Sequence, residues 1–353
     1  MPTYRALLNR IAEQHELTVY SEVPVERQWL ELEHRYRIKG GRIAKPRYLR
    51  DFLFLCMVIR DHMRVPFHLV HAHSTYPTGF VAVILQKVFH LPAVVSLHAA
   101  EASAFPDIQF GDLLHRRRTR INRWVIKHAK TVTTLTNFQR DEVVKNLQIR
   151  RPVVVMHRGV DVNRFYFERA RDLKEPITFL SVGYLNAIKD PETLLRAFYK
   201  IHMEVDSVLI IVGRDYTAGA VMRLAVELGI SHKIEYAGYV NHDNMNGFYR
   251  RADVLLHTAR YESQGMVIAE AMAAGVLVVG TKVGLLSDLS GECCLTAPTR
   301  DPDALARVAL DLLSRPEAMT RLRRNAYAWT QHHSLDVCCQ EILRLYQRSI
   351  TGQ

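Results

Sequence analysis

The stretch YESQGMVIAEAMAAG, residues 261–275, lies between two short apolar runs, DVLLHTA (253–259) and VLVVGT (276–281). Apolar runs of this length predict parallel β-strands that are buried on both faces. The stretch itself predicts a polar turn and then a helix that begins at Gly265–Met266 and ends at Gly275. The order strand, turn, helix, strand is typical of an α/β domain with a parallel sheet.

The same alternation continues through the whole chain. Other strand patterns are FHLVHAHS (67–74), AVVSLHA (93–99), ITFLSVGYL (177–185) and SVLIIVG (207–213). A chain of 353 residues is long for one domain, and the charged segment 167–176 ends in a proline just before a strand. We therefore expect two Rossmann-like domains, residues 1–168 and 169–334. Their ligands are expected at the carboxyl ends of the strands, in the cleft between the domains.

Two readings of Glu262 and Glu270 remain open on spacing alone. In the first, the carboxylates accept hydrogen bonds from the vicinal hydroxyls of a sugar and a ribose, and a diphosphate binds between them at the helix start. The amides available there belong to Gln264, Gly265, Met266 and Val267. In the second, Glu262 only complements the helix dipole, and Glu270 is a solvated residue of an ordinary surface helix.

Charge is distributed unevenly along the chain. Residues 1–168 contain 26 Lys and Arg against 15 Asp and Glu, whereas residues 169–353 contain 21 of each, so the net charge of +11 arises in the first half. Segments 35–50 and 115–130 hold seven basic residues each. We expect them to dock on an anionic membrane surface or a lipid phosphate; the alternative is a solvated basic face. No nucleic-acid partner is expected, because no recognisable binding fold accompanies the charge.

Several features bear on the compartment and on metals. No apolar stretch reaches the roughly 18 residues that a membrane span needs, and the N-terminus lacks the apolar core of a secretory signal. The five cysteines match no zinc or redox spacing and suit a reducing cytoplasm. His71 and His73 alternate on one strand, but no third ligand with suitable spacing follows. We expect a cytoplasmic protein without a bound metal.

An ordered set of segments carries a family resemblance. The segment 262–284, ESQGMVIAEAMAAGVLVVGTKVG, closely resembles the signature of glycosyltransferase family 4, whose members are retaining enzymes with the GT-B fold. It is preceded, in the order of the family, by HAHSTYPTG (71–79), SLHAAE (96–101), HRGVDVNRF (157–165) and VGYLNAIKDPETLLRAF (182–198). The resemblance covers the chain from about residue 60 and implies that the last helix, about residues 335–353, packs back on the first domain.

The resemblance also implies roles for individual residues. Glu270 would bind the nucleotide ribose, and the loop at residues 238–240 would hold the base through its backbone. His98, Lys189 and Glu262 are the expected catalytic residues: His98 near the reacting centre, Lys189 on the diphosphate and Glu262 on the hydroxyls of the donor sugar. The expected donor-binding residues are Gly183, Tyr184, Lys189, Gly213, Gly238, Tyr239, Val240, Glu262, Gln264, Gly265, Met266, Val267 and Glu270.

The implied chemistry follows from charge. Cleavage of the sugar–diphosphate bond develops negative charge on phosphate, which Lys189 and the helix start would stabilise without a metal ion or cofactor. In such enzymes the anomeric configuration of the sugar is retained because the acceptor hydroxyl attacks the anomeric carbon from the same face that the phosphate leaves. The departing phosphate takes the proton of the acceptor hydroxyl. Such a reaction needs no enzyme nucleophile, and the sequence offers no convincing nucleophile–base pair.

Three features depart from the family pattern. Tyr184 stands where an arginine is usual, so one cation at the phosphates is absent, and Arg214 and Arg158 are the candidates to replace it. Ala99 and Glu101 stand where glycine and aspartate are usual. The chain also begins with what reads as the family's first helix and second strand, without the first strand and its glycine-rich loop.

These observations predict a retaining, hexosyl-transferring enzyme. It would move a sugar from a nucleotide-diphosphate donor to a polysaccharide or lipid-linked acceptor at the cytoplasmic membrane face. One alternative is a catalytically inactive GT-B scaffold or partner subunit, which Tyr184 and the absent strand favour. Another is a sugar-nucleotide epimerase, against which the pair Glu262 and Glu270 argues.

Overall fold

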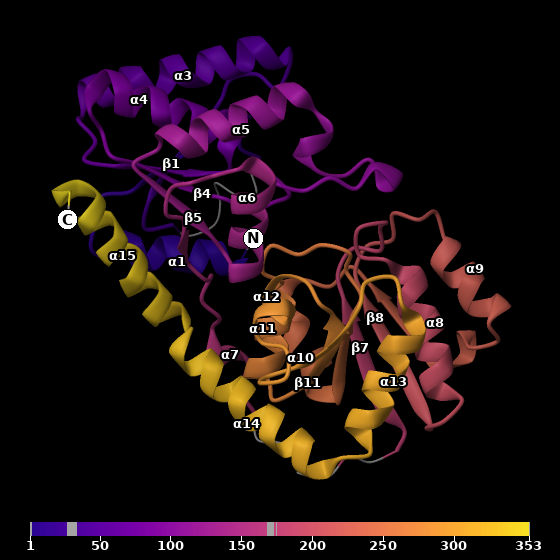
Figure 1. Ribbon diagram of the computed structural model, residues 1–353. Helices are drawn as coiled ribbons and strands as arrows, with labels where there is room; N and C mark the ends of the chain where they lie inside the picture. Colours follow the sequence, from indigo (N-terminus) through magenta and orange to yellow (C-terminus); the bar gives the residue numbers. More distant parts are fainter. Residues whose placement is uncertain (1, 27–33, 168–172, 174, 353) are drawn as a thin grey trace. The chain divides into compact units, whose positions relative to one another are not determined.

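The computed structural model describes residues 2–26, 34–167, 173 and 175–352 (Figure 1). The chain forms two compact units: unit 1 comprises Met1–Gly159 and Leu335–Gln353, and unit 2 comprises Val160–Ser334. The chain thus enters unit 2 at Val160. The sequence analysis placed the domain boundary later, between residues 168 and 169. Residues 168–172 lie outside the part of the chain that the structure describes.

Unit 1 contains two parallel sheets, of strand order β1-β2 and β3-β4-β5-β6. Its strands are β1 (Thr18–Ser21), β2 (Arg37–Gly40), β3 (Val70–His73), β4 (Ala93–Ser96), β5 (Thr131–Thr134) and β6 (Val154–Val155). Its α-helices are α1 (Pro2–Ala12), α3 (Arg47–Arg64), α4 (Phe80–Phe89), α5 (Arg116–His128), α6 (Asn137–Leu147) and α15 (Leu335–Thr351). Strand β2 was not predicted, because its residues RIKG belong to the basic segment 35–50 and lack an apolar run.

Helices lie on both sides of the larger sheet of unit 1. Helices α4, α5 and α6 contribute Val83, Val125 and Val143 to a core that includes the strands. Helices α1 and α15 pack together through a second cluster that contains Leu7 and Ile342. Figure 1 shows α4 and α5 on one side of the strands and α1 and α15 on the other. The C-terminal helix therefore belongs to the core of unit 1.

Unit 2 is a six-stranded parallel sheet of order β12-β11-β10-β7-β8-β9. Its strands are β7 (Ile177–Val182), β8 (Ser207–Val212), β9 (Ile234–Gly238), β10 (Val254–His257), β11 (Leu277–Thr281) and β12 (Leu295–Ala297). Its α-helices are α7 (Val162–Phe165), α8 (Pro191–His202), α9 (Ala220–Glu227), α10 (Met245–Arg251), α11 (Met266–Ala273), α12 (Gly284–Asp288), α13 (Pro302–Leu313) and α14 (Pro316–His332).

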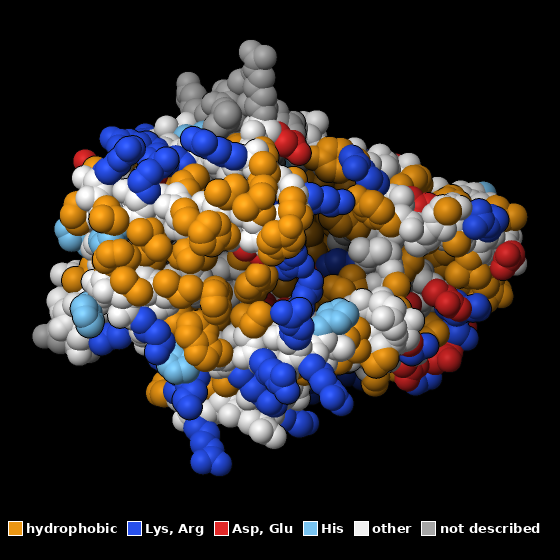
Figure 2. Space-filling view, turned by 90° about the horizontal axis from the view of Figure 1, so that it is seen from above, with side chains coloured by type: hydrophobic (Ala, Val, Ile, Leu, Met, Phe, Trp, Pro, Cys, Tyr) orange, Lys and Arg blue, Asp and Glu red, His pale blue; other side chains and the backbone are white. Residues whose placement is uncertain are grey.

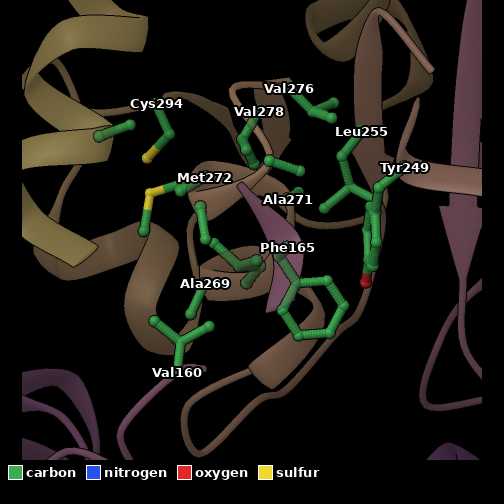
Figure 3. Close-up of a cluster of buried hydrophobic side chains, with 14 of the residues drawn as sticks. Val160, Phe165, Tyr249, Leu255, Ala269, Ala271, Met272, Val276, Val278 and Cys294 are labelled. Atoms are coloured by element: carbon green, nitrogen blue, oxygen red, sulfur yellow. The ribbon is translucent and has the colours of Figure 1, made fainter. Parts of the chain in front are cut away.

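The sheet of unit 2 is covered on both faces, as its apolar strands predict. On one face Phe179 packs against Phe198 of α8, and both side chains are fully buried. On the other face the residues of α11 join Phe165 and Tyr249 in a core that Figure 3 shows in close-up. Both units are therefore α/β structures with parallel sheets, as the alternating pattern predicts.

Helix α11 begins and ends where the sequence predicts. Gly265 has φ 84°, a left-handed conformation that is strained for any other residue, and a Cβ atom there would lie 2.6 Å from Cδ1 of Ile268. Gly275 follows the helix with φ 67°. The preceding turn, which carries Glu262 and Gln264, therefore lies at the carboxyl end of β10.

Candidate active site

Glu262 and Lys189 form an ion pair in unit 2. Glu262 follows β10, and Lys189 lies in the loop between β7 and α8. His257, the last residue of β10, places Nε2 3.5 Å from Oε1 of Glu262. Burial, with the Lys189 charge as a second cause, holds the pKa of His257 well below its usual range. His257 is therefore a neutral side chain at neutral pH, and the charged groups here are Lys189 and Glu262.

The loops that carry this pair are held by backbone contacts. The amide of Arg260 donates to the carbonyl of Ile188 at 2.8 Å, and the hydroxyl of Thr258 donates to the carbonyl of Lys189 at 2.9 Å. A Cβ atom on Gly284 would lie 2.9 Å from Cβ of Glu262, so only glycine allows the loop after β11 to approach this closely. The ammonium and the carboxylate are thus held by loops from three neighbouring strands.

A small hollow open to solvent adjoins Lys189. Its lining includes Gly183, Tyr184, Lys189 and His257. Burial lowers the pKa of the Lys189 ammonium to about 8. Of the predicted donor-binding residues, Gly183, Tyr184 and Lys189 line this one hollow. The sequence analysis did not single out His257, because it lies inside an apolar strand pattern.

Glu270 is buried, with 4% of its surface exposed. Nε2 of His242 lies 3.0 Å from Oε1 of Glu270, and the hydroxyl of Tyr249 donates to Oε2 at 2.8 Å. The reading of Glu270 as a solvated residue of a surface helix is therefore wrong. His242 and Tyr249 were missed by the sequence analysis, because they lie beyond β9 and on α10 and no local pattern links them to α11.

The remaining predicted donor-binding residues lie on the loops after β7, β8 and β9 and at the start of α11. The amide of Gly213 donates to the carbonyl of Gly238 at 2.7 Å, and a Cβ atom on Gly213 would lie 1.8 Å from the carbonyl oxygen of Gly183. Tyr184 and Tyr239 are exposed beside these glycines. The others are Val240, Gln264, Met266 and Val267, of which Gln264 is buried and the rest half-buried.

The predicted catalytic histidine, His98, lies in unit 1 after β4. Its Nε2 atom lies 2.6 Å from Nδ1 of His73, and the two rings stack with centroids 4.8 Å apart. Burial holds the pKa of both histidines well below the usual range, so both rings are neutral. Tyr4 of α1 contacts Nε2 of His73 through its hydroxyl.

Glu101 supports the backbone of the loop that carries His98. Its two carboxylate oxygens accept hydrogen bonds from the amides of His98 at 3.2 Å and of Ala99 at 2.9 Å. Burial raises the pKa of Glu101, and the amide donors oppose this rise. Glu101, which stands where the family usually has aspartate, is thus a buried residue that supports the loop of His98.

The two candidates for the absent cation lie in different units. Arg158 lies in unit 1, with its guanidinium 5.8 Å from the ring centre of Tyr4, and burial lowers its pKa. Arg214 lies in unit 2, in the loop after β8, and its carbonyl accepts a hydrogen bond from the amide of Leu185 at 2.9 Å. Arg214 is therefore the candidate whose loop is bonded directly to the loop of Tyr184.

Two family models match consecutive parts of the chain. The model described as Glycosyltransferase Family 4 matches residues 3–164, and the model described as Glycosyl transferases group 1 matches residues 163–329. The chain belongs to glycosyltransferase family 4. As a family 4 glycosyltransferase it has the GT-B fold, as the sequence resemblance predicted.

Two curated relatives are named as glycosyltransferases. An uncharacterised glycosyltransferase of Methanocaldococcus jannaschii is 25% identical, over 88% of this chain and 84% of the relative. A D-inositol 3-phosphate glycosyltransferase of Corynebacterium jeikeium is 28% identical, over 70% of this chain and 65% of the relative. The prediction that the protein is a glycosyltransferase is thus confirmed at the level of the family.

Solved structures share the fold of this family 4 glycosyltransferase. Sucrose-phosphate synthase from Thermosynechococcus elongatus superposes with a TM-score of 0.84 at 20% identity, covering 99% of this chain and 93% of that one. HepE of Anabaena, in complex with UDP and glucose, superposes with a TM-score of 0.79 at 17% identity, covering 97% and 95%. At these identities the likeness establishes the fold.

Proposed function

We propose that this protein transfers a sugar, with retention of anomeric configuration, from a nucleotide-diphosphate donor to a polysaccharide or lipid-linked acceptor at the cytoplasmic face of a membrane. The observation that carries the proposal is the arrangement around α11: Glu270 is buried and held by His242 and Tyr249, while Glu262 is paired with Lys189. Two fixed carboxylates and one ammonium supply the contacts that a ribose, a sugar and a diphosphate require.

The donor contacts can be assigned by chemistry. Each carboxylate oxygen of Glu270 has a second lone pair, so it can accept a ribose hydroxyl while it keeps His242 and Tyr249 as donors. Lys189 can turn from Glu262 to the diphosphate, and Glu262 is then available to the hydroxyls of the donor sugar. The UDP and glucose in the HepE complex support a nucleotide-sugar donor for a chain of this fold.

The proposed reaction uses few protein groups. As the bond between sugar and phosphate breaks, Lys189 and the start of α11 stabilise the negative charge on the diphosphate. The departing phosphate takes the proton of the acceptor hydroxyl, which attacks from the same face. We assign to His98, whose ring is neutral and contacts His73, a hydrogen bond to the sugar, as the family resemblance implies. The reaction as proposed needs no metal ion or cofactor.

The proposed membrane face lies on unit 1. Helix α3 buries Phe54 and Val58, but it exposes Tyr48 by 78%, Phe52 by 60% and Met63 by 73%. Figure 2 looks onto the layer of α3, α4 and α5, where apolar side chains gather with lysines and arginines around them. Within the described residues, no helix is long and apolar enough to cross a membrane. Such a surface suits attachment to anionic lipid by apolar insertion and charge.

A donor assay tests the transferase. The protein is incubated with UDP-, GDP- and ADP-linked sugars, and nucleotide release and melting temperature are measured with and without a membrane extract as the acceptor source. We expect one donor to raise the melting temperature and to be turned over, and product NMR to show the anomeric configuration of the donor. If no donor shifts the melting temperature and none is hydrolysed, the proposal fails. Stabilisation without turnover would favour an inactive GT-B scaffold, to which Tyr184 in place of arginine points.

Vesicle flotation tests the membrane face. We expect the protein to float with vesicles rich in phosphatidylglycerol but not with pure phosphatidylcholine, and the bound fraction to fall as salt is raised. Phe52→Ser should reduce the bound fraction. Tyr166→Ser, at an exposed tyrosine of unit 2, is the matched control and should have no effect. Equal flotation of both variants would contradict α3 as the docking element.

A further inference from the structure

Two histidines of β3 each contact a tyrosine of a neighbouring helix. His71 and His73 lie two residues apart and therefore point to the same face of the strand, with their ring centroids 4.3 Å apart. The hydroxyl of Tyr346, on α15, lies 2.6 Å from Nδ1 of His71. The hydroxyl of Tyr4, on α1, contacts Nε2 of His73. Each of the alternating histidines is therefore the partner of a phenol.

The two histidines differ in what lies at their other nitrogen. Nε2 of His71 lies 2.6 Å from Oγ of Ser96, and that hydroxyl lies 2.6 Å from Oγ1 of Thr133. Nδ1 of His73 lies 2.6 Å from Nε2 of His98. Strand register explains this second contact, because His73 is paired with Ser96 and His98 follows two residues later. One histidine thus leads to buried hydroxyls of the sheet, and the other leads to the expected catalytic histidine.

The direction of the hydrogen bond between Tyr4 and His73 follows from acidity. A phenol is a stronger acid and a weaker base than a neutral imidazole, so Tyr4 donates and Nε2 of His73 accepts. Burial holds the pKa of Tyr4 well above its usual range and the pKa of His73 well below, so the phenol keeps its proton and the ring is neutral. A neutral imidazole that accepts at Nε2 carries its proton on Nδ1.

The protonation of His73 determines that of His98. Because Nδ1 of His73 carries a proton, it donates to Nε2 of His98. Burial holds the pKa of His98 well below its usual range, so this ring is also neutral and carries its proton on Nδ1. In the reverse direction Tyr4 would accept from His73, and among the described residues Tyr4 has no second acceptor for its own proton.

We propose that Tyr4 and His73 are positioning residues that hold His98 in its Nδ1–H form, so that His98 meets the donor sugar as a hydrogen-bond donor. The inference rests on the proposed function, because the sugar is that of the donor. In the opposite tautomer Nδ1 of His98 would present a lone pair to the sugar instead of a proton. A neighbour that binds the other ring nitrogen is the usual means of fixing a histidine tautomer.

Histidine NMR tests the tautomer directly. With isotope-labelled histidine, the nitrogen shifts of a neutral ring show which nitrogen carries the proton, and the variants His73→Asn and His98→Asn assign the two rings. We expect both rings in the Nδ1–H form in the wild type. In Tyr4→Phe we expect the His98 signals to move toward the Nε2–H form, because nothing then fixes Nε2 of His73 as an acceptor.

Tyr346→Phe is the matched control. It removes the equivalent phenol from His71, a histidine whose other hydrogen bond runs to Ser96 and not to His98. Among the described residues no hydrogen bond joins His71 to His73. We therefore expect the His98 signals of Tyr346→Phe to match those of the wild type.

Turnover is measured on the same preparations, with the nucleotide sugar that the wild type uses. Tyr4→Phe should lower kcat about 3- to 30-fold, as expected for the loss of one hydrogen bond, and should leave the Kd of the nucleoside diphosphate within about twofold. Tyr346→Phe should keep both constants of the wild type. Melting temperatures show that both variants are folded.

Each outcome decides the inference. His98 in the Nε2–H form in the wild type, or an unchanged Nδ1–H form in Tyr4→Phe, overturns it whatever the turnover. A changed tautomer with the kcat of the wild type would also overturn it, as would equal losses of kcat in the two tyrosine variants. If the wild type turns over no nucleotide sugar, the proposed function fails and with it the role at the sugar, while the spectra still decide whether Tyr4 and His73 fix the tautomer.

Discussion

Nε2 of His242 lies 3.0 Å from Oε1 of Glu270, and the hydroxyl of Tyr249 lies 2.8 Å from Oε2. Two side chains from outside α11 thus hold a carboxylate in the middle of that helix. A buried carboxylate with two donors is fixed in direction, and each of its oxygens still has a lone pair for a ligand. This relationship is the basis of the first prediction.

Glu270→Gln should weaken nucleotide binding by roughly 10- to 100-fold, because a hydrogen bond to a charged group contributes about 1.5–3 kcal/mol. The measurement is calorimetry with UDP, GDP and ADP. Glu192→Gln, on an exposed carboxylate of α8, is the control and should bind as wild type does. An unchanged affinity in Glu270→Gln would remove Glu270 from the donor site.

Donor affinity should fall as the pH rises above about 8. Burial lowers the pKa of Lys189 to about 8, and only its protonated form attracts the diphosphate. The contact between Lys189 and the diphosphate is therefore fully present below pH 7 and is lost as Lys189 deprotonates. Well above pH 8, the part of the donor affinity that depends on this contact falls by up to about tenfold per pH unit. Of the other groups at this site, His257 stays neutral because burial holds its pKa low, so it adds no titration in this range.

The variant Lys189→Arg distinguishes deprotonation of Lys189 from other effects of high pH on donor binding, because a guanidinium stays protonated over the whole pH range tested. Binding is measured by calorimetry from pH 6.5 to 9.5. We expect a flat alkaline limb in Lys189→Arg and a falling one in the wild type. Parallel curves would show that Lys189 is not the titrating group.

Glu101→Ala should lower turnover about 10- to 100-fold and leave nucleotide affinity unchanged. The substitution removes the acceptor of the His98 and Ala99 amides, so the loop moves, and small displacements of a reacting group have large effects on rate. Steady-state kinetics and calorimetry are compared on the same preparations. Asp141→Ala, at an exposed carboxylate of α6, should behave as wild type. A matching loss of nucleotide affinity in Glu101→Ala would mean that the whole protein is disturbed.

Phe198→Ala should destabilise unit 2 by about 3–5 kcal/mol, because it removes a fully buried ring between α8 and the sheet. Urea unfolding followed by circular dichroism gives the change. Lys200→Ala, on the same helix, removes only a surface ion pair with Asp303 and should cost less than about 1 kcal/mol. Similar midpoints for the two variants would contradict the packing of α8.

The fold class, and the elements that carry Glu262 and Glu270, could be predicted because their signals are local. Apolar runs mark β10 and β11, and the glycines at 265 and 275 mark the ends of α11. The sequence analysis missed strand β2, which is rich in charged residues, and strand β12, which has only three residues. Neither strand shows an apolar run or an alternating pattern that would mark it. Their place in the sheets depends on neighbours that the local sequence does not contain.

The amino-acid sequence by itself determined that Glu262 lies in a turn after a strand, that Glu270 lies within the following helix, and that this segment resembles a donor-binding signature. Only the tertiary structure decided what surrounds them. Glu270 is buried because His242 and Tyr249, 28 and 21 residues away, come to it from beyond β9 and from α10. Burial and pairing depend on which strands are adjacent in a parallel sheet, and that adjacency is a property of the whole chain rather than of any short stretch.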